Sequence, residues 1–425
     1  MNNSFVLKGA VIDSKNQDTL RLTKQGYVVC VNGICEGVFE ELPEEYQDLE
    51  IRDYTDYLII PGMSDLHLHA PQYTYRGLGM DLELLEWLEV NTFPEESRYA
   101  DLDYAEKAYE LFTEELLHTT TTRACVFATI HKEATLLLMD RLEQSGIKSM
   151  VGKVNMDRNA PDYYCEKSAQ ESVQMTREWI IEAKQRFKRT IPVITPRFVP
   201  TCSDELLKQL GNLAREYDLP VQSHISENLD EIAWVKELCP KISCYGDVYH
   251  QAGLFGNDVR TVMAHSVYSS EEEIKLMKEN QVFIAHCPQS NTNVASGIAP
   301  VRRYLDDNLR IGLGTDIAGG FSMSILRAMA DAIQVSKLRY RIVDETQKPV
   351  RLEEAFYMAT AGGGAFFGKV GKFEKGYEFD AVVLDDHALK TPKELSLRDR
   401  LERIVYMSEQ CQIIDKYVEG THLLL

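Results

Sequence analysis

Eight short apolar segments, each followed by a longer amphipathic stretch, constrain the fold of this chain more than any other feature of its sequence. Their length and apolar content are typical of buried strands, and the stretches between them have the apolar spacing of helices. Repeated strand–helix units predict a (β/α)8 TIM barrel of the α/β class. The alternative, a doubly wound open sheet, usually has a Gly-rich first turn, which is missing after the first segment. The eight segments are residues 64–69, 122–130, 149–157, 191–198, 219–226, 260–267, 282–288 and 310–317.

The two ends of the chain differ from this pattern. Residues 1–60 contain short strand-like stretches separated by turns, and residues 370–386 return to strand character. We therefore predict a small β-sandwich domain built from residues 1–60 and 368–425. The barrel domain would then span residues 61–367.

Composition argues against several classes of partner. The chain has 46 basic and 66 acidic residues and a net charge of −20, whereas nucleic acids and anionic membranes attract basic surfaces. No apolar run approaches the roughly 20 residues of a membrane helix, and the N-terminus lacks the pattern of a secretory signal. The nine cysteines include no C-x-x-C pair, which favours reduced thiols. We expect a cytoplasmic protein that binds neither nucleic acid nor membrane.

The first apolar segment contains two histidines, His67 and His69, in the sequence "SDLHLH". Side chains at positions i and i+2 of a strand share a face. We therefore expect Asp65, His67 and His69 on one face and Leu66 and Leu68 on the other. Because TIM barrels build their active sites at the carboxyl ends of the strands, this pair is a candidate metal site.

Other strand ends supply matching groups. His224 ends the fifth segment, His265 ends the sixth and Asp316 ends the eighth. All of these ends lie on one rim of a barrel, so their side chains can converge. His286, at the end of the seventh segment, is more simply a structural residue. The other histidines are scattered and receive no role: His118, His131, His250, His387 and His422.

Imidazole and carboxylate ligands without thiolates suit Zn²⁺, with Fe²⁺ as the alternative. Such a metal lowers the pKa of a bound water to about 7, which makes hydroxide available near neutral pH. Hydrolysis also needs a group that moves protons. Glu227 lies three residues after His224, in the sequence "HISE", and is the candidate general acid and base.

The motifs that carry this chemistry resemble those of the amidohydrolase superfamily. The resemblance rests on H-x-H after "PGMSD", one histidine on each of the fifth and sixth strands, and the aspartate of "GTD". Longer stretches resemble the guanine deaminases of that superfamily. These stretches are "HLHAPQYTYRGLGMDLELLEWLEVNTFPEE", "GKVNMD", "TPRF" and "HISEN".

The resemblance implies a reaction and a set of roles. The reaction is hydrolytic deamination of guanine to xanthine and ammonia in purine catabolism or salvage. One zinc ion per chain would supply the attacking hydroxide, and the enzyme would be a homodimer. Glu227 would shuttle protons, Asp316 would orient the water, and His265 would hydrogen-bond to it. The implied metal ligands are His67, His69, His224 and Asp316. The implied substrate contacts are His69, Gln72, Arg197, Phe198, His224, Glu227 and Asp316.

The chemistry of the implied pocket residues agrees with a purine substrate. Arg197 and Gln72 can hydrogen-bond to the carbonyl and ring nitrogens of guanine. Phe198 can pack against the flat ring. Trp87 and Phe93 either line the same pocket or pack within a helix.

Two alternatives remain open from the sequence. One is a related deaminase or chlorohydrolase acting on a pterin, a triazine or an adenine derivative. The other is a non-catalytic scaffold, which is disfavoured because every ligand position and Glu227 are filled. Superfamily members with two metals bridge them by a carboxylated lysine, often on the fourth strand. Residues 191–198 contain no lysine, so we expect one metal, and Lys153 is the one other candidate for that role.

Overall fold

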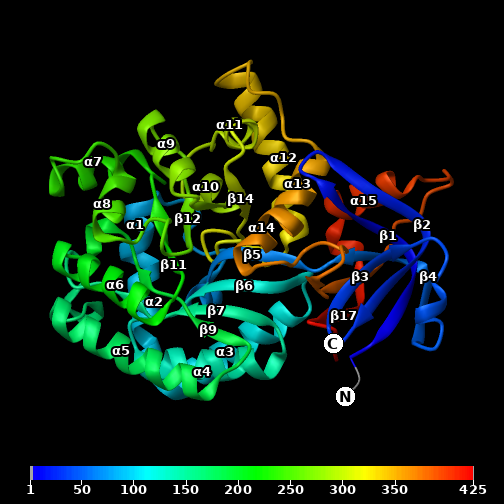
Figure 1. Ribbon diagram of the computed structural model, residues 1–425. Helices are drawn as coiled ribbons and strands as arrows, with labels where there is room; N and C mark the ends of the chain where they lie inside the picture. The colour runs from blue at the N-terminus through cyan, green and yellow to red at the C-terminus, as the bar shows by residue number, and fades with distance from the viewer. Residues whose placement is uncertain (1–2, 425) are drawn as a thin grey trace.

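All eight predicted strands are present, and they run parallel in two four-stranded sheets (Figure 1). The computed structural model describes residues 3–424, and these residues form an α/β fold. The strands of the first sheet, in spatial order, are β5 (Met63–His69), β6 (Thr121–Phe127), β7 (Lys148–Gly152) and β9 (Thr190–Pro192). Those of the second are β11 (Val221–Ile225), β12 (Thr261–His265), β13 (Phe283–His286) and β14 (Arg310–Leu313).

The third and fourth predicted strands are each interrupted. The third forms β7 and then β8 (Val154–Asn155), and the fourth forms β9 and then β10 (Thr195–Pro196). The short strands β8 and β10 pair with each other. The Arg197 carbonyl, directly after β10, accepts from the Ser223 hydroxyl at 3.2 Å, so the residues that follow β10 lie beside β11.

Backbone contacts connect the two parallel sheets on both sides. A parallel bridge joins Ile194, after β9, to Val221 of β11. On the other side, the Asp316 amide donates to the His67 carbonyl at 2.8 Å. The His69 amide donates to the Ile317 carbonyl at 2.9 Å. The end of the last strand therefore lies beside the end of the first.

Helices cover the outer faces of the strands, and their sequences explain why they form. In α6 (Asp204–Tyr217), the Ser203 side chain caps the first turn by accepting from the Leu206 amide at 3.1 Å. Leu206, Leu210 and Leu213 recur at helical spacing and are buried against the strands. The other longer helices are α3 (Leu102–Leu117), α4 (Lys132–Ser145), α5 (Ala169–Arg186), α7 (Leu229–Leu238), α8 (Tyr245–Ala252), α9 (Glu271–Glu279), α12 (Ile325–Ile342) and α15 (Leu397–Tyr406). The shorter ones are α1 (Leu84–Trp87), α2 (Phe93–Ser97), α10 (Pro288–Asn293), α11 (Val301–Asp306), α13 (Leu352–Tyr357) and α14 (Gly363–Phe367).

Both ends of the chain contribute to one eight-stranded sheet. Strand β4 pairs antiparallel with β16, which joins the N-terminal and C-terminal parts. The strand order is β15 (Tyr377–Glu378), β3 (Ile34–Phe39), β2 (Thr19–Val31), β1 (Phe5–Asn16), β4 (Glu50–Pro61), β16 (Ala381–Asp385), β17 (Gln412–Val418) and β18 (Thr421–Leu423).

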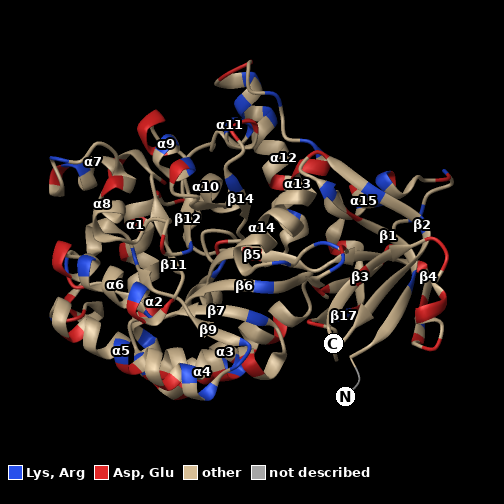
Figure 2. Cartoon of the chain, viewed as in Figure 1, with Lys and Arg blue, Asp and Glu red and all other residues tan. Residues whose placement is uncertain are grey.

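Residues of both charge signs are interspersed along the outer helices (Figure 2). Within residues 3–424, no helix combines the length and the apolar character needed to cross a membrane. The nine cysteines are all free thiols.

A buried ion pair fastens the terminal sheet to β6. The Arg123 guanidinium donates to both carboxylate oxygens of Asp380 at 2.6 and 2.7 Å, and neither side chain is exposed to solvent. Glu378 approaches the same guanidinium at 2.8 Å. Removing one partner of a buried pair leaves an uncompensated charge, which is more costly than the loss of an exposed pair.

We expect Asp380→Asn to lower the free energy of unfolding by about 3 kcal/mol because it leaves the Arg123 charge poorly compensated. The matched control is Asp53→Asn, which breaks the exposed Lys8–Asp53 pair in the same sheet and should change stability by at most about 1 kcal/mol. Thermal and denaturant unfolding of both variants measure the difference. Equal stabilities for the two variants would contradict the assigned role of Asp380.

Candidate active site

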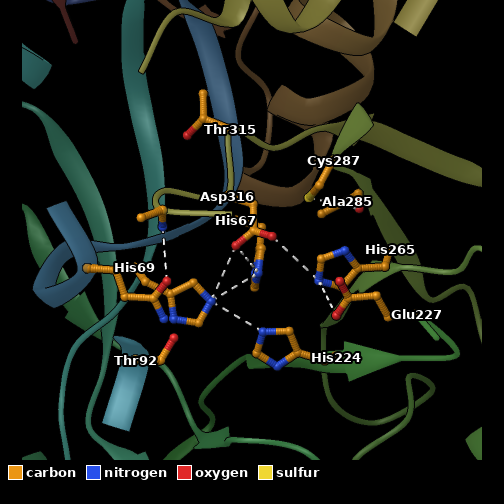
Figure 3. Close-up of polar contacts among 12 residues, drawn as sticks. His67, His69, Thr92, His224, Glu227, His265, Ala285, Cys287, Thr315 and Asp316 are labelled. Carbon is orange, nitrogen blue, oxygen red and sulfur yellow. Dashed lines mark hydrogen bonds and ion pairs between the residues drawn. The ribbon is translucent and has the colours of Figure 1, made fainter. Parts of the chain in front are cut away.

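Three histidine side chains meet at the carboxyl ends of the strands (Figure 3). His67 and His69 come from β5 and His224 from β11. The Nε2 atom of His69 lies 3.3 Å from Nε2 of His67 and 3.3 Å from Nε2 of His224. Asp316, which follows β14, places its Oδ1 atom 3.2 Å from His67 Nε2 and 3.5 Å from His69 Nε2. The four residues predicted as metal ligands are therefore brought together.

The protonation of His224 indicates what this cluster can bind. Its Nδ1 atom lies 2.5 Å from the Arg197 carbonyl oxygen, which can only accept, so Nδ1 carries the proton. The Nε2 lone pair then faces His69. Burial lowers the pKa of His67, His69 and His224, which favours the neutral, ligating form.

The spacing of the donor atoms fits a tetrahedral metal. Metal–nitrogen bonds of about 2.0–2.1 Å place the ligands of a tetrahedron about 3.3 Å apart. Four of the six spacings within the cluster are 3.2–3.5 Å. Lone pairs that approach this closely are stabilised by a shared cation. The residues present therefore fit a divalent metal ion.

The expected alternation of side chains along β5 is wrong at one point. The pairing with β6 shifts register between Asp65 and Leu68, which inserts an extra residue. As a result, Leu66 belongs to the hydrophobic cluster that contains Cys125 of β6. Leu68 belongs to a separate hydrophobic cluster, which also contains buried side chains of the helices. Asp65 does not join the histidines. Its carboxylate accepts from the Thr315 amide at 3.0 Å and from the Thr315 hydroxyl at 2.5 Å, which holds the segment before Asp316 against β5.

A second group of titratable side chains adjoins the cluster. His265 Nε2 lies 3.3 Å from Glu227 Oε2 and 3.7 Å from Asp316 Oδ2. Its Nδ1 atom lies 2.9 Å from the Asn291 side-chain oxygen. Burial raises the pKa of Glu227 to about 7. Although burial opposes its charge, the pKa of His265 is raised by Glu227 and Asp316. A carboxyl that titrates near neutrality beside an imidazole can both accept and donate a proton.

Backbone turns at the strand ends aim these side chains. His265 has φ of 77° and Asp316 has φ of 49°, both in the left-handed region. For residues other than glycine, this conformation costs free energy. Non-glycine residues that adopt it are concentrated at functional sites. These turns direct the two side chains toward the cluster, although the strand pattern predicts only a regular end.

A cavity of about 470 Å³, including its open mouth, lies beside the histidines. Gln72, Arg197 and Phe198 line it, as the sequence predicts, together with Trp87. Phe93 is not among the lining residues, and its ring lies 5.1 Å from the Arg197 guanidinium carbon. The remaining lining residues are His69, Leu84, Leu88, His224, Glu227, Glu231, His265, Ser290, Val294 and Asp316. The size and lining suit a flat heterocycle.

A model of the amidohydrolase family matches residues 58–423. The chain belongs to the amidohydrolase family. Its relatives within that family include a guanine deaminase of Dictyostelium discoideum, 37% identical with 98% of each chain covered. A guanine deaminase of Escherichia coli is 37% identical over 95% of this chain and 90% of its own.

A solved structure of the guanine deaminase from C. acetobutylicum, with guanine bound in its active site, superposes with a TM-score of 0.95. The two chains are 46% identical, and the alignment covers 99% of this amidohydrolase and 100% of the other protein. The similarity therefore extends through both the parallel strands and the terminal sheet.

Several residues that support the amidohydrolase site were not predicted. Asn291 holds the ring of His265, and Ser296 donates to Glu227 Oε1 at 3.0 Å. Glu231 accepts from the Glu227 amide at 3.0 Å. The polar run "SNTNVAS" at 290–296, which contains Asn291 and Ser296, was the available signal, because polar residues that follow a strand end are candidates for a functional site.

The candidate for a bridging lysine and the histidine interpreted as structural have surroundings of their own. Lys153 donates to the Glu166 carboxylate at 2.6 Å, so it is engaged in a buried ion pair. His286 is buried, and neither ring nitrogen has a hydrogen-bond partner among residues 3–424. Two groups of residues in that range could hold a metal ion, and His286 belongs to neither. They are His67, His69 and His224, and His67, His265 and Asp316.

Proposed function

We propose that this amidohydrolase is a guanine deaminase that hydrolyses guanine to xanthine and ammonia. The observation that carries the proposal is the close match, over the whole chain, to a guanine deaminase whose structure holds guanine. The pocket supports the same substrate, since it places hydrogen-bonding and aromatic groups beside the histidine cluster.

His67, His69, His224 and Asp316 would hold one divalent metal, which we propose is zinc, although Fe²⁺ suits the same ligands. A bound zinc ion lowers the pKa of water to about 7 and so makes hydroxide available near neutral pH. Asp316 offers Oδ1 to the histidine cluster and Oδ2 toward His265. Its second oxygen is thus free to orient the attacking water.

Glu227 performs the proton transfers. It accepts a proton from the water that attacks C2 of guanine and gives it to the ring nitrogen next to C2. The proton of the new C2 hydroxyl is then transferred to the exocyclic amine, the C2–N bond breaks so that ammonia leaves, and the C2 carbonyl of xanthine remains. His265 lies against both Glu227 and Asp316, and it hydrogen-bonds to the oxygen on which negative charge develops.

The substrate is held by groups on the other wall of the cavity. Gln72 and Arg197 would hydrogen-bond to the carbonyl and ring nitrogens of the purine, and Phe198 would pack on its face. His69 and His224 also line the cavity and would lie against the reacting end of the ring.

We also propose that the two parallel sheets form one (β/α)8 barrel, supported by the backbone contacts that connect them on both sides. Residues 61–367 would be the barrel domain, and residues 1–60 and 368–425 a small β-sandwich domain.

The enzyme would act as a homodimer in the cytoplasm, as the family resemblance and composition indicate. Light scattering of the purified enzyme measures the oligomeric state.

Ammonia release from guanine, adenine, cytosine, a pterin and a chlorotriazine tests the proposed substrate. We expect turnover of guanine alone, with about one metal ion per chain. Treatment with a chelator should abolish turnover, and added zinc should restore it. Turnover of another ring without guanine would keep the hydrolytic chemistry and reject the proposed contacts of Gln72, Arg197 and Phe198 with guanine. No turnover of any of these rings by metal-loaded enzyme would reject the proposal.

A further inference from the structure

A buried carboxylate that the reaction does not use lies behind the substrate pocket. Glu96 belongs to α2, within the "TFPEE" motif, and its side chain is fully buried. It contacts two pocket residues from distant parts of the chain, Gln72 and Arg197, which lie 24 and 101 residues away. Glu96 is absent from the lining of the cavity, so it can affect a substrate only through these two neighbours.

Glu96 fixes the orientation of the Gln72 amide. Gln72 Nε2 donates to Glu96 Oε1 at 2.8 Å, and the Ala318 amide donates to Gln72 Oε1 at 2.9 Å. A carboxylate only accepts and a backbone amide only donates, so the nitrogen and oxygen of Gln72 cannot exchange places. The remaining hydrogen-bonding capacity of this amide therefore points in a fixed direction.

Glu96 also compensates the charge of Arg197. The Arg197 guanidinium donates to Glu96 Oε2 at 2.5 Å and to Oε1 at 3.2 Å, and the arginine is only 3% exposed. Phe93, from the same helix, lies under the guanidinium. Although burial opposes its charge, the pKa of Arg197 is raised by Glu96. An arginine paired in this way keeps N–H groups that can donate to a ligand. Because the carboxylate compensates the guanidinium charge, the pair as a whole presents little net charge to the pocket.

We propose that Glu96 is a positioning residue that makes the pocket select neutral heterocycles over anions. It aligns Gln72 and Arg197 and cancels the positive charge that would otherwise attract an anionic ligand. This inference rests on the proposed function, because it concerns how the same pocket recognises a neutral purine.

The first test compares Glu96→Gln with Glu95→Gln. Glutamine at position 96 keeps an acceptor for Gln72 and removes the charge. Glu95 is a matched control on the same helix, with contacts to Arg98 and Thr74 outside the pocket. We expect Glu96→Gln to lower kcat/KM for guanine by about ten- to hundredfold, mainly through KM. Glu95→Gln should stay within about twofold of wild type, and Glu96→Asp should recover part of the loss.

The second test measures charge preference directly, with purine-6-carboxylate and purine-6-carboxamide as competitive inhibitors. These probes have similar shapes and differ in charge. We expect Glu96→Gln to shift the ratio of their inhibition constants toward the carboxylate by at least about tenfold, because Arg197 is then uncompensated. An unchanged ratio in folded, metal-loaded Glu96→Gln would overturn the proposal.

A double variant covers the case in which Glu96→Gln does not fold. Glu96→Gln combined with Arg197→Gln removes both charges together, which a buried site tolerates better than removal of one. We expect the ratio of its inhibition constants for the carboxylate and the carboxamide to stay within about threefold of wild type, because the charges of Glu96 and Arg197 are both absent. A shift of tenfold or more toward the carboxylate would overturn the proposal. If wild type does not deaminate guanine, calorimetric binding of the two probes still measures charge preference, so the two proposals fail separately.

Discussion

Glu227→Gln is expected to lower kcat for guanine by at least about a hundredfold, since glutamine cannot take or give the proton. The substitution preserves shape, and Ser296 can still hydrogen-bond to the side chain in place of its contact with Glu227 Oε1. Metal content and Tm should therefore remain close to those of wild type. Steady-state ammonia release, metal analysis and thermal unfolding of one preparation measure all three properties.

The matched control is Glu237→Gln, the same substitution at an exposed position of α7. It should leave kcat unchanged. Near-normal turnover by metal-loaded Glu227→Gln would contradict the assignment of Glu227 as the proton shuttle.

The pH dependence of wild type provides an independent check on Glu227. Its pKa is raised to about 7 by burial, so the carboxyl is increasingly protonated as the pH falls below 7. A protonated carboxyl cannot accept the proton of the attacking water. We therefore expect kcat/KM to fall with pH below about 7 in wild type, and the limb should change in the residual activity of Glu227→Gln, where the carboxyl is gone and only the metal-bound water would titrate in this range.

His67→Ala is expected to lose the bound metal and to reduce turnover by about a thousandfold or more. The reason is that metal activation of water supplies several kcal/mol, and each 1.36 kcal/mol is about tenfold in rate. His67 is nearly fully buried among the other ligands, so no surface residue can replace it. Metal analysis after dialysis and ammonia release measure the two losses.

Two comparisons separate metal loss from misfolding. His250→Ala, at an exposed position of α8, should keep full metal and activity. Chelated wild type should recover with added zinc, whereas His67→Ala should not. If His67→Ala retains one metal per chain and wild-type turnover, the assigned ligand set is wrong.

Local patterns in the sequence were sufficient to predict the strands, the helices and the residues at the strand ends. Strand and helix periodicities depend on neighbouring residues, so the eight parallel strands and the helices around them could be read directly. His67, His224 and Asp316 could be placed on one rim because parallel strands with helical connections all end on the same side. The contact between the ends of the first and last strands, with His67 Nε2 3.2 Å from Asp316 Oδ1, follows from that arrangement.

The bulge in β5 and the left-handed turns at His265 and Asp316 could not be read from the sequence. Each depends on pairing with another strand, and the local sequence is compatible with a regular strand end. The third and fourth strands were predicted as continuous for the same reason, although each is interrupted.

From the sequence alone, residue type and strand order predicted a metal-compatible cluster at the strand ends, and the resemblance of its motifs indicated an amidohydrolase. Only the tertiary structure decided how the pocket behind it is held. In the sequence, Glu96 is one acidic residue of a helix, next to the similar Glu95. Its contacts with Gln72 and Arg197 join segments 24 and 101 residues apart. A carboxylate is buried only where such partners compensate its charge, and that compensation exists only in the folded chain.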